Sequence, residues 1–306
     1  MKRLLAALLC LGMLAGASVG ASAAGERLTV YASFYPMYDF VSKIGGDKID
    51  VINMVPSGME PHDWEPTPSD IVGLETADML IYNGAGMEHW VDDVLAALGN
   101  KDLFVVEASE GVPLLDSHAH DHDYDHDHDH DHGDFDPHVW LDPMNAKIEM
   151  ENIKRALVTA DPTNAEVYEA NYAFYVAELD ALDQEFKDAL DPLINRDIVV
   201  AHQAYGYLCA AYGLNQVAIE GLSPDSEPSP ARVAKIIDFG KAHNVKVIFF
   251  EELVSPKVAE SIASAIGAQT EVLSPIEGRS DAQRDAGDDY FSIMRQNLAA
   301  LLAALQ

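Results

Sequence analysis

Histidine is concentrated in one stretch of this sequence, and its side chain is a frequent ligand of transition-metal ions. Residues 116–136 alternate largely between aspartate and histidine and contain seven histidines: His118, His120, His122, His126, His128, His130 and His132. An eighth, His138, follows in Asp136-Pro-His-Val-Trp, which has the composition of ordinary folded chain. We interpret the first seven as a flexible metal-collecting loop and His138 as a buried ligand whose partners come from the rest of the chain.

The alternation limits what the tract can bind. In an extended chain, successive imidazoles on one side lie roughly 6.5–7 Å apart, which is too far for neighbours to share an ion without bending. The tract therefore predicts several weak, interconverting zinc sites. Its carboxylates should raise the histidine pKa values, so that zinc capture fades as the pH falls. A solvated tract without a role is the alternative interpretation.

Two further histidines follow predicted strands. His62 comes after the strand predicted at 50–55 and lies between Pro61 and Trp64, and His202 directly follows the strand predicted at 197–201. Ligands of parallel α/β sheets bind at the carboxyl ends of strands, so these two positions support each other as metal ligands. Taken singly, a loop histidine such as His62 is often only solvated, and a buried one such as His138 needs a hydrogen-bonding partner.

A site for a divalent cation also favours a carboxylate. Asp288 and Asp289 precede the predicted C-terminal helix, where an aspartate is also an ordinary N-cap residue. Glu60 and Glu65 flank His62 and are the other candidates.

The remaining histidines have structural interpretations. His89 begins a predicted helix, and His243 ends one, where an imidazole faces the last carbonyl groups of the helix. We assign no metal to either.

The chain reads as two similar halves of alternating strands and helices. Strands are predicted at 28–34, 50–55, 79–83 and 103–108, and again at 197–201, 216–220, 245–251 and 270–273. Strands that alternate with helical segments predict parallel sheets connected by right-handed crossovers. The fold class is therefore α/β with two lobes.

One long helix is predicted between the halves. Asp161 is a suitable N-cap and Pro162 fits the first helical position, and no further proline or glycine occurs before Pro192. About thirty residues at 1.5 Å each would span about 45 Å, the length of a two-lobed protein. The expected organisation is an N-terminal lobe at 24–160, a rigid linking helix at 161–191 and a C-terminal lobe at 192–306.

Composition indicates an exported protein. Lys2 and Arg3 precede a short apolar run, and Ala21-Ser-Ala resembles a cleavage site, so residues 1–23 predict a secretory signal that is too short to span a membrane. Beyond it Cys209 is the only cysteine, which excludes an intramolecular disulfide and a cysteine-based zinc cluster. The formal net charge of −32 repels nucleic acid and anionic lipid and favours cations. We expect neither nucleic-acid binding nor membrane insertion.

Several motifs, in order, resemble a known family. They are Glu60-Pro-His-Asp-Trp-Glu-Pro with Pro68-Ser-Asp, Asp136-Pro-His-Val-Trp-Leu-Asp-Pro, Ala201-His-Gln-Ala-Tyr-Gly-Tyr, Glu227-Pro-Ser-Pro, Phe249-Phe-Glu-Glu with Ser255-Pro-Lys, and Gly287-Asp-Asp-Tyr. Over essentially its whole mature length the chain is similar to the zinc/manganese-type (ZnuA/TroA-like) solute-binding proteins of ABC transporters. The acidic histidine-rich loop looks like that of zinc-importing members.

This resemblance implies a fold and a ligand set. The fold would be two four-stranded parallel sheets flanked by helices and joined by one long helix. The ligands would be His62, His138 and His202, with Asp288 as the carboxylate, so that two ligands come from each lobe. In some zinc-type relatives the fourth position is water or a glutamate beside the first histidine, which keeps Glu60 in reserve. His89 stands where relatives often have proline.

Three imidazoles and one carboxylate favour zinc, because Zn²⁺ takes four such ligands whereas Mn²⁺ prefers more oxygen. Manganese-type relatives resemble this chain less, since they carry a carboxylate at the position of His202. Manganese remains the alternative ion.

The resulting hypothesis is a monomeric, periplasmic or otherwise exported zinc carrier that is not an enzyme and serves an ABC permease and its ATPase. One alternative is a zinc hydrolase with Glu60 or Glu65 as base, although the motif His-Glu-x-x-His is absent. Another is an extracellular metal buffer or adhesin without a transporter.

Overall fold

The structure is a computed structural model that describes residues 27–116, 135–224 and 228–306. The predicted signal at 1–23 and the seven histidines of the tract lie outside the described residues. At the ends of that gap Asp116 and Phe135 form an antiparallel bridge, so the described residues on its two sides lie next to each other.

The first lobe is a parallel sheet with strands in the order β2-β1-β3-β4. Its elements are β1 (Leu28–Ala32), α1 (Tyr35–Gly45), β2 (Ile49–Asn53), α2 (Pro68–Leu74), β3 (Met79–Tyr82), α3 (Val91–Ala97) and β4 (Phe104–Glu107). Val30 of β1 pairs with Val51 on one side and Met79 on the other, and β1 and β3 supply the apolar residues that suit strands covered on both faces.

The second lobe repeats this topology, with strands in the order β6-β5-β7-β8. Its elements are β5 (Asp197–Val200), α6 (Gly206–Tyr212), β6 (Asn215–Ala218), α7 (Pro230–Ala242), β7 (Val247–Phe250), α8 (Lys257–Ile266), β8 (Gln269–Val272), α9 (Asp281–Ala286) and α10 (Tyr290–Leu305). The predicted α/β class with two four-stranded parallel sheets is confirmed.

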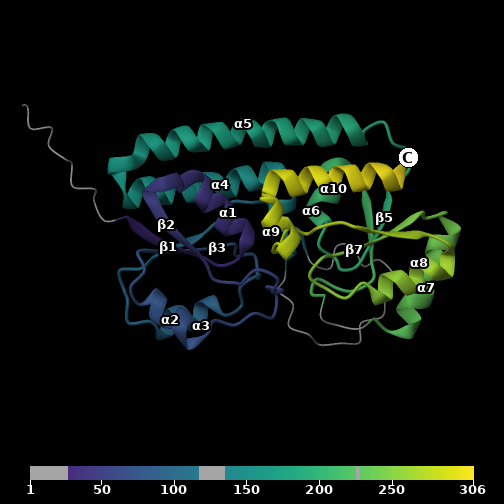
Figure 1. Ribbon diagram of the computed structural model, residues 1–306, viewed down its shortest axis with the longest axis horizontal. Helices are drawn as coiled ribbons and strands as arrows, with labels where there is room; N and C mark the ends of the chain where they lie inside the picture. The colour runs from purple at the N-terminus through teal and green to yellow at the C-terminus, as the bar shows by residue number, and fades with distance from the viewer. Residues whose placement is uncertain (1–26, 117–134, 225–227) are drawn as a thin grey trace, which may run out of the picture.

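A long helix, α5 (Ala165–Leu190), runs beside both lobes, as predicted (Figure 1). Its start differs in detail, because a 3₁₀ turn at Pro162–Asn164 precedes it. Asp161 accepts hydrogen bonds from the side chains of Asn164 and Tyr168 and does not cap α5 itself. A second helix that the sequence reasoning missed, α4 (Pro143–Ala160), packs along α5.

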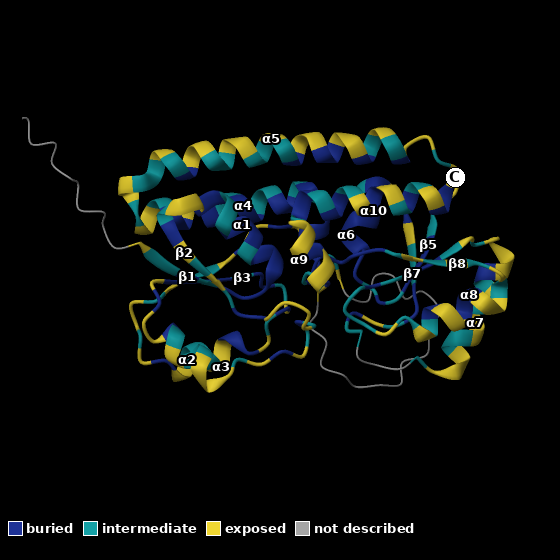
Figure 2. Cartoon of the chain, in the orientation of Figure 1, coloured by how far each residue is buried: buried dark blue, intermediate teal, exposed yellow. Residues whose placement is uncertain are grey.

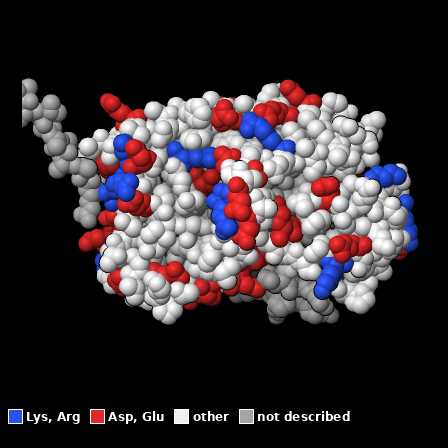
Figure 3. Space-filling view, viewed as in Figure 1, with Lys and Arg blue, Asp and Glu red and all other residues white. Residues whose placement is uncertain are grey.

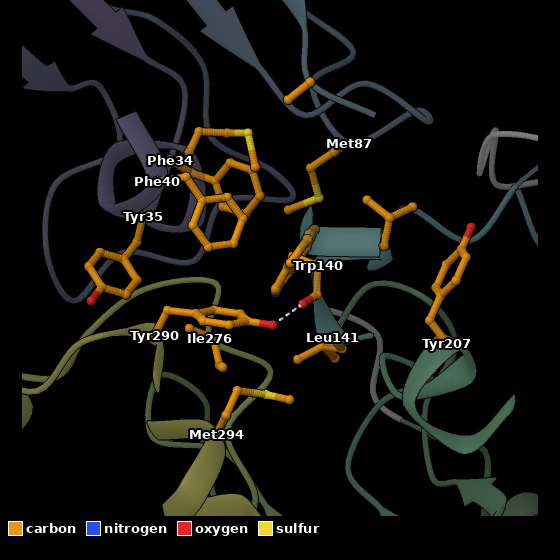
Figure 4. Packing of buried hydrophobic residues seen from close by; sticks show 14 of the residues in the cluster. Phe34, Tyr35, Phe40, Met87, Trp140, Leu141, Tyr207, Ile276, Tyr290 and Met294 are labelled. Atoms are coloured by element: carbon orange, nitrogen blue, oxygen red, sulfur yellow. Dashed lines mark hydrogen bonds between the residues drawn. The ribbon is translucent and has the colours of Figure 1, made fainter. Parts of the chain in front are cut away.

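The centre of the molecule is a hydrophobic core that crosses from one lobe to the other (Figure 4). Trp140, fully buried, packs edge-on against Phe34 of the first lobe with ring centroids 5.0 Å apart. Its carbonyl oxygen accepts a hydrogen bond of 2.7 Å from the hydroxyl of Tyr290, the first residue of α10. Because the lobes share a hydrophobic core, they resist large hinge motions about this contact.

Burial follows the layers of the fold. Most of the buried strand residues belong to the central strands β1, β3, β5 and β7, and the inner faces of α4 and α10 are buried too. The edge strands β4 and β8 have no buried residue, and α2, α3 and the outer face of α5 are largely exposed (Figure 2). On the face drawn in Figure 3, acidic side chains are spread over both lobes and many of the basic ones lie beside them. Within the described parts of the chain, no helix has the length and apolarity needed to cross a bilayer.

Candidate metal centre

Four potential ligand atoms converge where the two lobes meet, from His62, His138, His202 and Glu277. The Nε2 atom of His138 lies 3.2 Å from Nε2 of His62, 3.3 Å from Nε2 of His202 and 2.9 Å from Oε1 of Glu277. The same Oε1 atom is 3.2 Å from Nε2 of His62 and 3.4 Å from Nε2 of His202. In a tetrahedral site with bonds of about 2.0–2.1 Å, ligand atoms lie about 3.3–3.4 Å apart. The donor set and its spacing therefore fit a four-coordinate Zn²⁺ ion.

Each ligand side chain belongs to a loop at the carboxyl end of a sheet. His62 follows β2, and His138 immediately precedes the 3₁₀ turn at Val139–Leu141. His202 follows β5 and Glu277 follows β8, so two ligands come from each lobe. His138 and His202 are fully buried and Glu277 is 3 % exposed, whereas the His62 side chain keeps 10 % of its surface. The site is thus screened from water except on the side of His62.

Two carboxylates behind the site orient two of the histidines. Nδ1 of His138 lies 2.8 Å from Oδ1 of Asp136, and Nδ1 of His202 lies 2.6 Å from Oε1 of Glu251. A carboxylate at Nδ1 holds the proton there and leaves the Nε2 lone pair for the metal. Glu251 follows β7, the strand beside β5, so neighbouring strand ends supply both the ligand and its orienting group.

Asp136 also connects the lobes. Its backbone carbonyl accepts a hydrogen bond of 2.9 Å from the hydroxyl of Tyr207 in α6. Beside that residue, Gly206 lies so close to the Asp136 carboxylate that a Cβ atom would collide with Oδ2. Glycine is required here because the backbone of α6 approaches the carboxylate that orients His138.

The imidazoles and Glu277 influence one another strongly. Burial lowers the pKa of His62. Burial acts in the same direction on His138 and His202, but the carboxylates of Asp136, Glu251 and Glu277 outweigh it and raise the pKa of both imidazoles. Burial alone would raise the pKa of Glu277, yet the three imidazoles hold it well below its usual range. A dication that takes these atoms must therefore displace protons from imidazole nitrogens.

Glu277 is presented by a strained loop. The preceding residue, Ile276, is fully buried and has φ = 62°, a left-handed conformation that β-branched residues rarely adopt. The loop is anchored on both sides: Asn297 binds the backbone of Ser274 with hydrogen bonds of 2.9 and 2.7 Å, and the Trp140 indole donates to the carbonyl of Pro275 at 2.7 Å. The shared core therefore fixes the position of the carboxylate ligand.

The structure brings together the three histidines named from the sequence but does not bring the predicted carboxylate, Asp288, to them. Oδ1 of Asp288 accepts hydrogen bonds of 3.0 Å from Ser292 and of 3.0 Å from Gln296 at the start of α10, away from the imidazoles. Its neighbour Asp289 is the N-cap of that helix, in a capping box with Ser292. The N-terminus of α10 thus uses both aspartates, and Glu277 is the carboxylate that lies with the three imidazoles.

The other candidates have different partners. Oε2 of Glu60 accepts the backbone N–H of His62 at 3.0 Å, so this residue shapes the loop of a ligand and is not among the four converging atoms. Glu65 lies 3.4 Å from His89 on the surface. His243 ends α7, and its Nδ1 atom lies 2.7 Å from Asp197, which agrees with a structural role.

Glu277, Asp136 and Glu251 are the site residues that sequence reasoning did not assign. A usable signal existed for two of them, because Glu251 is the last residue of one predicted strand and Glu277 follows another, at the end where ligands bind. Asp136 stands two residues before His138, a spacing that suits a carboxylate bound to the same imidazole.

Comparisons with known proteins agree with this geometry. The family model for the periplasmic zinc-uptake complex component A, ZnuA, matches residues 30–304. The chain is 47 % identical over 286 residues to the high-affinity zinc uptake system protein ZnuA of Bacillus subtilis, covering 93 % of this chain and 90 % of that protein. It is 38 % identical over 285 residues to the zinc-binding protein AdcA of Streptococcus pyogenes, covering 90 % of this chain but only 55 % of that longer protein.

A solved structure extends the likeness to three dimensions. The Zn(II)-bound ZnuA-like domain of Streptococcus pneumoniae AdcA superposes with a TM-score of 0.79 at 34 % sequence identity, covering 92 % of this chain and 99 % of that domain. Fold, ligand chemistry and sequence lead to the same assignment: this chain belongs to the ZnuA family of zinc-uptake complex components.

Proposed function

We propose that this protein captures Zn²⁺ between its two lobes and delivers it to the permease of an ABC importer. The observation that carries the proposal is the convergence of three imidazole nitrogens and one carboxylate oxygen at separations of 2.9–3.4 Å. The ligands would be His62, His138, His202 and Glu277. Membership of a zinc-uptake family supports zinc as the cargo.

The ligand set favours zinc over manganese. Only one of the four atoms is oxygen, whereas Mn²⁺ prefers carboxylate, carbonyl and water ligands in larger number. The four atoms are already close to the spacing of a small tetrahedral site, and two histidines are held in one orientation by Asp136 and Glu251. A rigid site of this kind disfavours a larger, six-coordinate ion.

The same geometry supports carriage over catalysis. Catalytic zinc keeps a coordination position open for water, whereas four protein ligands close the tetrahedron. Of the bases considered for a hydrolase, Glu60 binds the backbone N–H of His62 and Glu65 lies on the surface beside His89. Neither carboxylate is among the four atoms that converge on the site.

Capture and release follow from the division of ligands between lobes. The first lobe presents His62 and His138, and the second presents His202 and Glu277. An ion that bridges them gains all four bonds only while the lobes keep their present separation. A partner that shifts one lobe slightly would therefore weaken binding. We assign that role to the permease, with the ATPase as its source of energy.

The remaining parts of the proposal concern transport to the site. The acidic histidine tract would collect zinc weakly and pass it to the buried centre. The protein would act outside the cytoplasm as a monomer, exported by the signal at residues 1–23.

The decisive experiment is a metal titration of the metal-free protein, with zinc and manganese in competition. One tight zinc site per chain is expected, and deletion of residues 117–134 should remove only additional weak sites. A preference for manganese would overturn the ion assignment. Undiminished tight binding in a variant with His62, His138 and His202 all changed to alanine would overturn the site.

A further inference from the structure

A cavity of about 370 Å³ lies next to the metal centre and shares Glu277 with it. Both lobes line this cavity. The first lobe contributes Tyr35 and Tyr38 of α1, the end of β2 with Asn53, and the loop at 55–57, and the second lobe contributes residues 277–279. Its volume is in the range of small-ligand sites in proteins. The cavity is much larger than a zinc ion needs, which raises the question of what else it accepts.

The cation in this cavity is Arg279. Its Nη1 atom donates to the backbone carbonyl of Asp288 at 2.8 Å, and its guanidinium stacks on the ring of Tyr35, 4.6 Å from the centroid. Its Nε atom is buried without a hydrogen-bond partner. Among the described residues, no carboxylate forms an ion pair with it, in contrast to Arg284 and Arg295, which each pair with acidic side chains. Arg196, which donates to backbone carbonyl groups, likewise has no carboxylate partner in the described part of the chain, so what sets Arg279 apart is its place in the lining of the cavity.

The acidic residues around Arg279 are engaged elsewhere. The Asp288 carboxylate accepts from Ser292 and Gln296, and Asp289 pairs with Lys43 at 2.8 Å. The Glu277 carboxylate faces the imidazoles. With Zn²⁺ on three neutral imidazoles and Glu277, the centre carries a net positive charge, and Arg279 adds a second. The guanidinium N–H groups that do not bind Asp288 can form charge-assisted hydrogen bonds with the oxygens of a carboxylate.

Building on the proposed function, we propose that this cavity binds a small carboxylate anion that accompanies the zinc ion, so that the natural substrate includes zinc held by an organic acid. The carboxylate rests on Arg279 while the ion reaches Glu277 and the imidazoles. In this transfer, bonds from zinc to the chelator's oxygens break as bonds to Nε2 and Oε1 atoms form. Imidazole protons pass to water, and no electron is transferred. The cavity gives the departing chelator a place beside the site.

Equilibrium binding tests the subsite directly. Succinate, a dicarboxylate that chelates zinc weakly, is titrated calorimetrically into the zinc-loaded protein. We expect saturable binding that Arg279→Gln weakens by about ten- to a hundredfold, as for the loss of a charge-assisted hydrogen-bonded pair. Arg279→Lys, which keeps the charge but loses the fork, should fall between. Arg284→Gln is the matched control, because it removes a surface arginine of the adjacent helix α9 and should leave succinate binding unchanged.

Loading kinetics test the role in delivery. Zinc is offered at one fixed free concentration, buffered either by citrate or by a polyamine chelator without carboxylates. Loading is followed by the intrinsic tryptophan fluorescence, because the ring of Trp140 lies 5.4 Å from that of His138. Loading from citrate should be several-fold faster than from the polyamine in the wild type and in Arg284→Gln, and equal from both in Arg279→Gln. No succinate binding at millimolar concentration, or equal loading from both buffers in the wild type, overturns the proposal. Neither of these two outcomes changes the affinity of the protein for zinc. Failure of the carboxylate proposal is therefore distinguishable from failure of the zinc assignment, which the metal titration tests.

Discussion

Oε1 of Glu277 lies 2.9 Å from Nε2 of His138, although 139 residues separate them in the chain. One residue belongs to the second lobe and the other to the first, so this contact joins the lobes at the metal centre. Both side chains are buried, and both are held from behind, His138 by Asp136 and Glu277 by the anchored loop at 274–277. The pair is therefore the most direct test of the ligand set.

Glu277→Gln should weaken zinc binding by more than about a hundredfold, because changes even to groups behind a ligand cost about ten- to a hundredfold. Asp288→Asn should leave the zinc affinity unchanged, since its carboxylate serves Ser292 and Gln296. Competition with a chromophoric chelator measures both dissociation constants. An equal loss of zinc affinity in the two variants would show that Asp288 is also a ligand of the ion.

Glu251→Gln tests the orientation of His202. The amide oxygen of Gln can still accept a hydrogen bond from Nδ1–H of His202, but the substitution removes the negative charge that raises the pKa of this imidazole. We expect zinc to bind about tenfold more weakly with the stoichiometry unchanged. Glu252→Gln, one residue further along and bound to Gln283, is the matched control. An unaltered dissociation constant in Glu251→Gln would mean that packing alone fixes the imidazole.

Zinc affinity should depend on pH in a defined direction. Carboxylates raise the pKa of His138 and His202 above the ordinary 6.5, despite their burial. Protons therefore compete with zinc for both Nε2 atoms already above pH 6.5, and the dissociation constant should increase steadily as the pH falls through neutrality. Titrations between pH 8 and 6 in the variant lacking residues 117–134 measure this without the tract. A flat profile would show that the imidazoles are already unprotonated.

How far the sequence predicts this site depends on the residue. His202 is predictable because it directly follows a clear apolar strand, and in parallel sheets that end of a strand binds ligands. Glu277 follows a strand too, but the conformation that aims it is not readable, because Ile276 adopts a left-handed φ that its side chain disfavours. Asp288 was chosen from a motif, and that motif describes the capped start of α10. Strands follow from local pattern, whereas the convergence of loops depends on packing between lobes.

The stability of the protein should fall as the pH rises through the titration of Glu88. Burial raises the pKa of this carboxyl from its ordinary value of 4.5 to about 7. Hydrogen bonds from Ser33, Asn83 and Gly84 act in the opposite direction but do not outweigh the burial. Between these values the folded protein holds a proton that the unfolded chain releases. The contribution is complete below pH 4.5 and is lost as the pH rises towards 7, by up to about 3 kcal/mol.

Urea unfolding of the metal-free protein at several pH values measures this slope. Glu88→Gln should flatten it between pH 4.5 and 7, whereas Asp92→Asn, an exposed change on the neighbouring helix α3, should not. An identical slope in Glu88→Gln and the wild type would contradict the assignment of the raised pKa to this carboxyl.

Lys43 also connects the two lobes. Its Nζ atom lies 3.1 Å from Asp39 in α1 and 2.8 Å from Asp289 at the start of α10. The Lys43 and Asp39 side chains are only 11 % and 10 % exposed, so Lys43→Met leaves a nearly buried carboxylate without its cation. We expect the free energy of unfolding to fall by about 2–3 kcal/mol, below the 3–5 kcal/mol of fully buried pairs because Asp289 is partly solvated.

The control for Lys43→Met is Lys48→Met, which removes a lysine paired with the exposed Asp47 and should leave stability unchanged. Because Lys43 ties α1 to α10, its loss should also loosen the separation of the lobes that the four ligands require. Zinc should then dissociate faster from Lys43→Met than from Lys48→Met, in stopped-flow transfer to an excess of chelator. Equal dissociation rates, together with a lowered stability, would show that the shared core around Trp140 alone keeps the lobes in register.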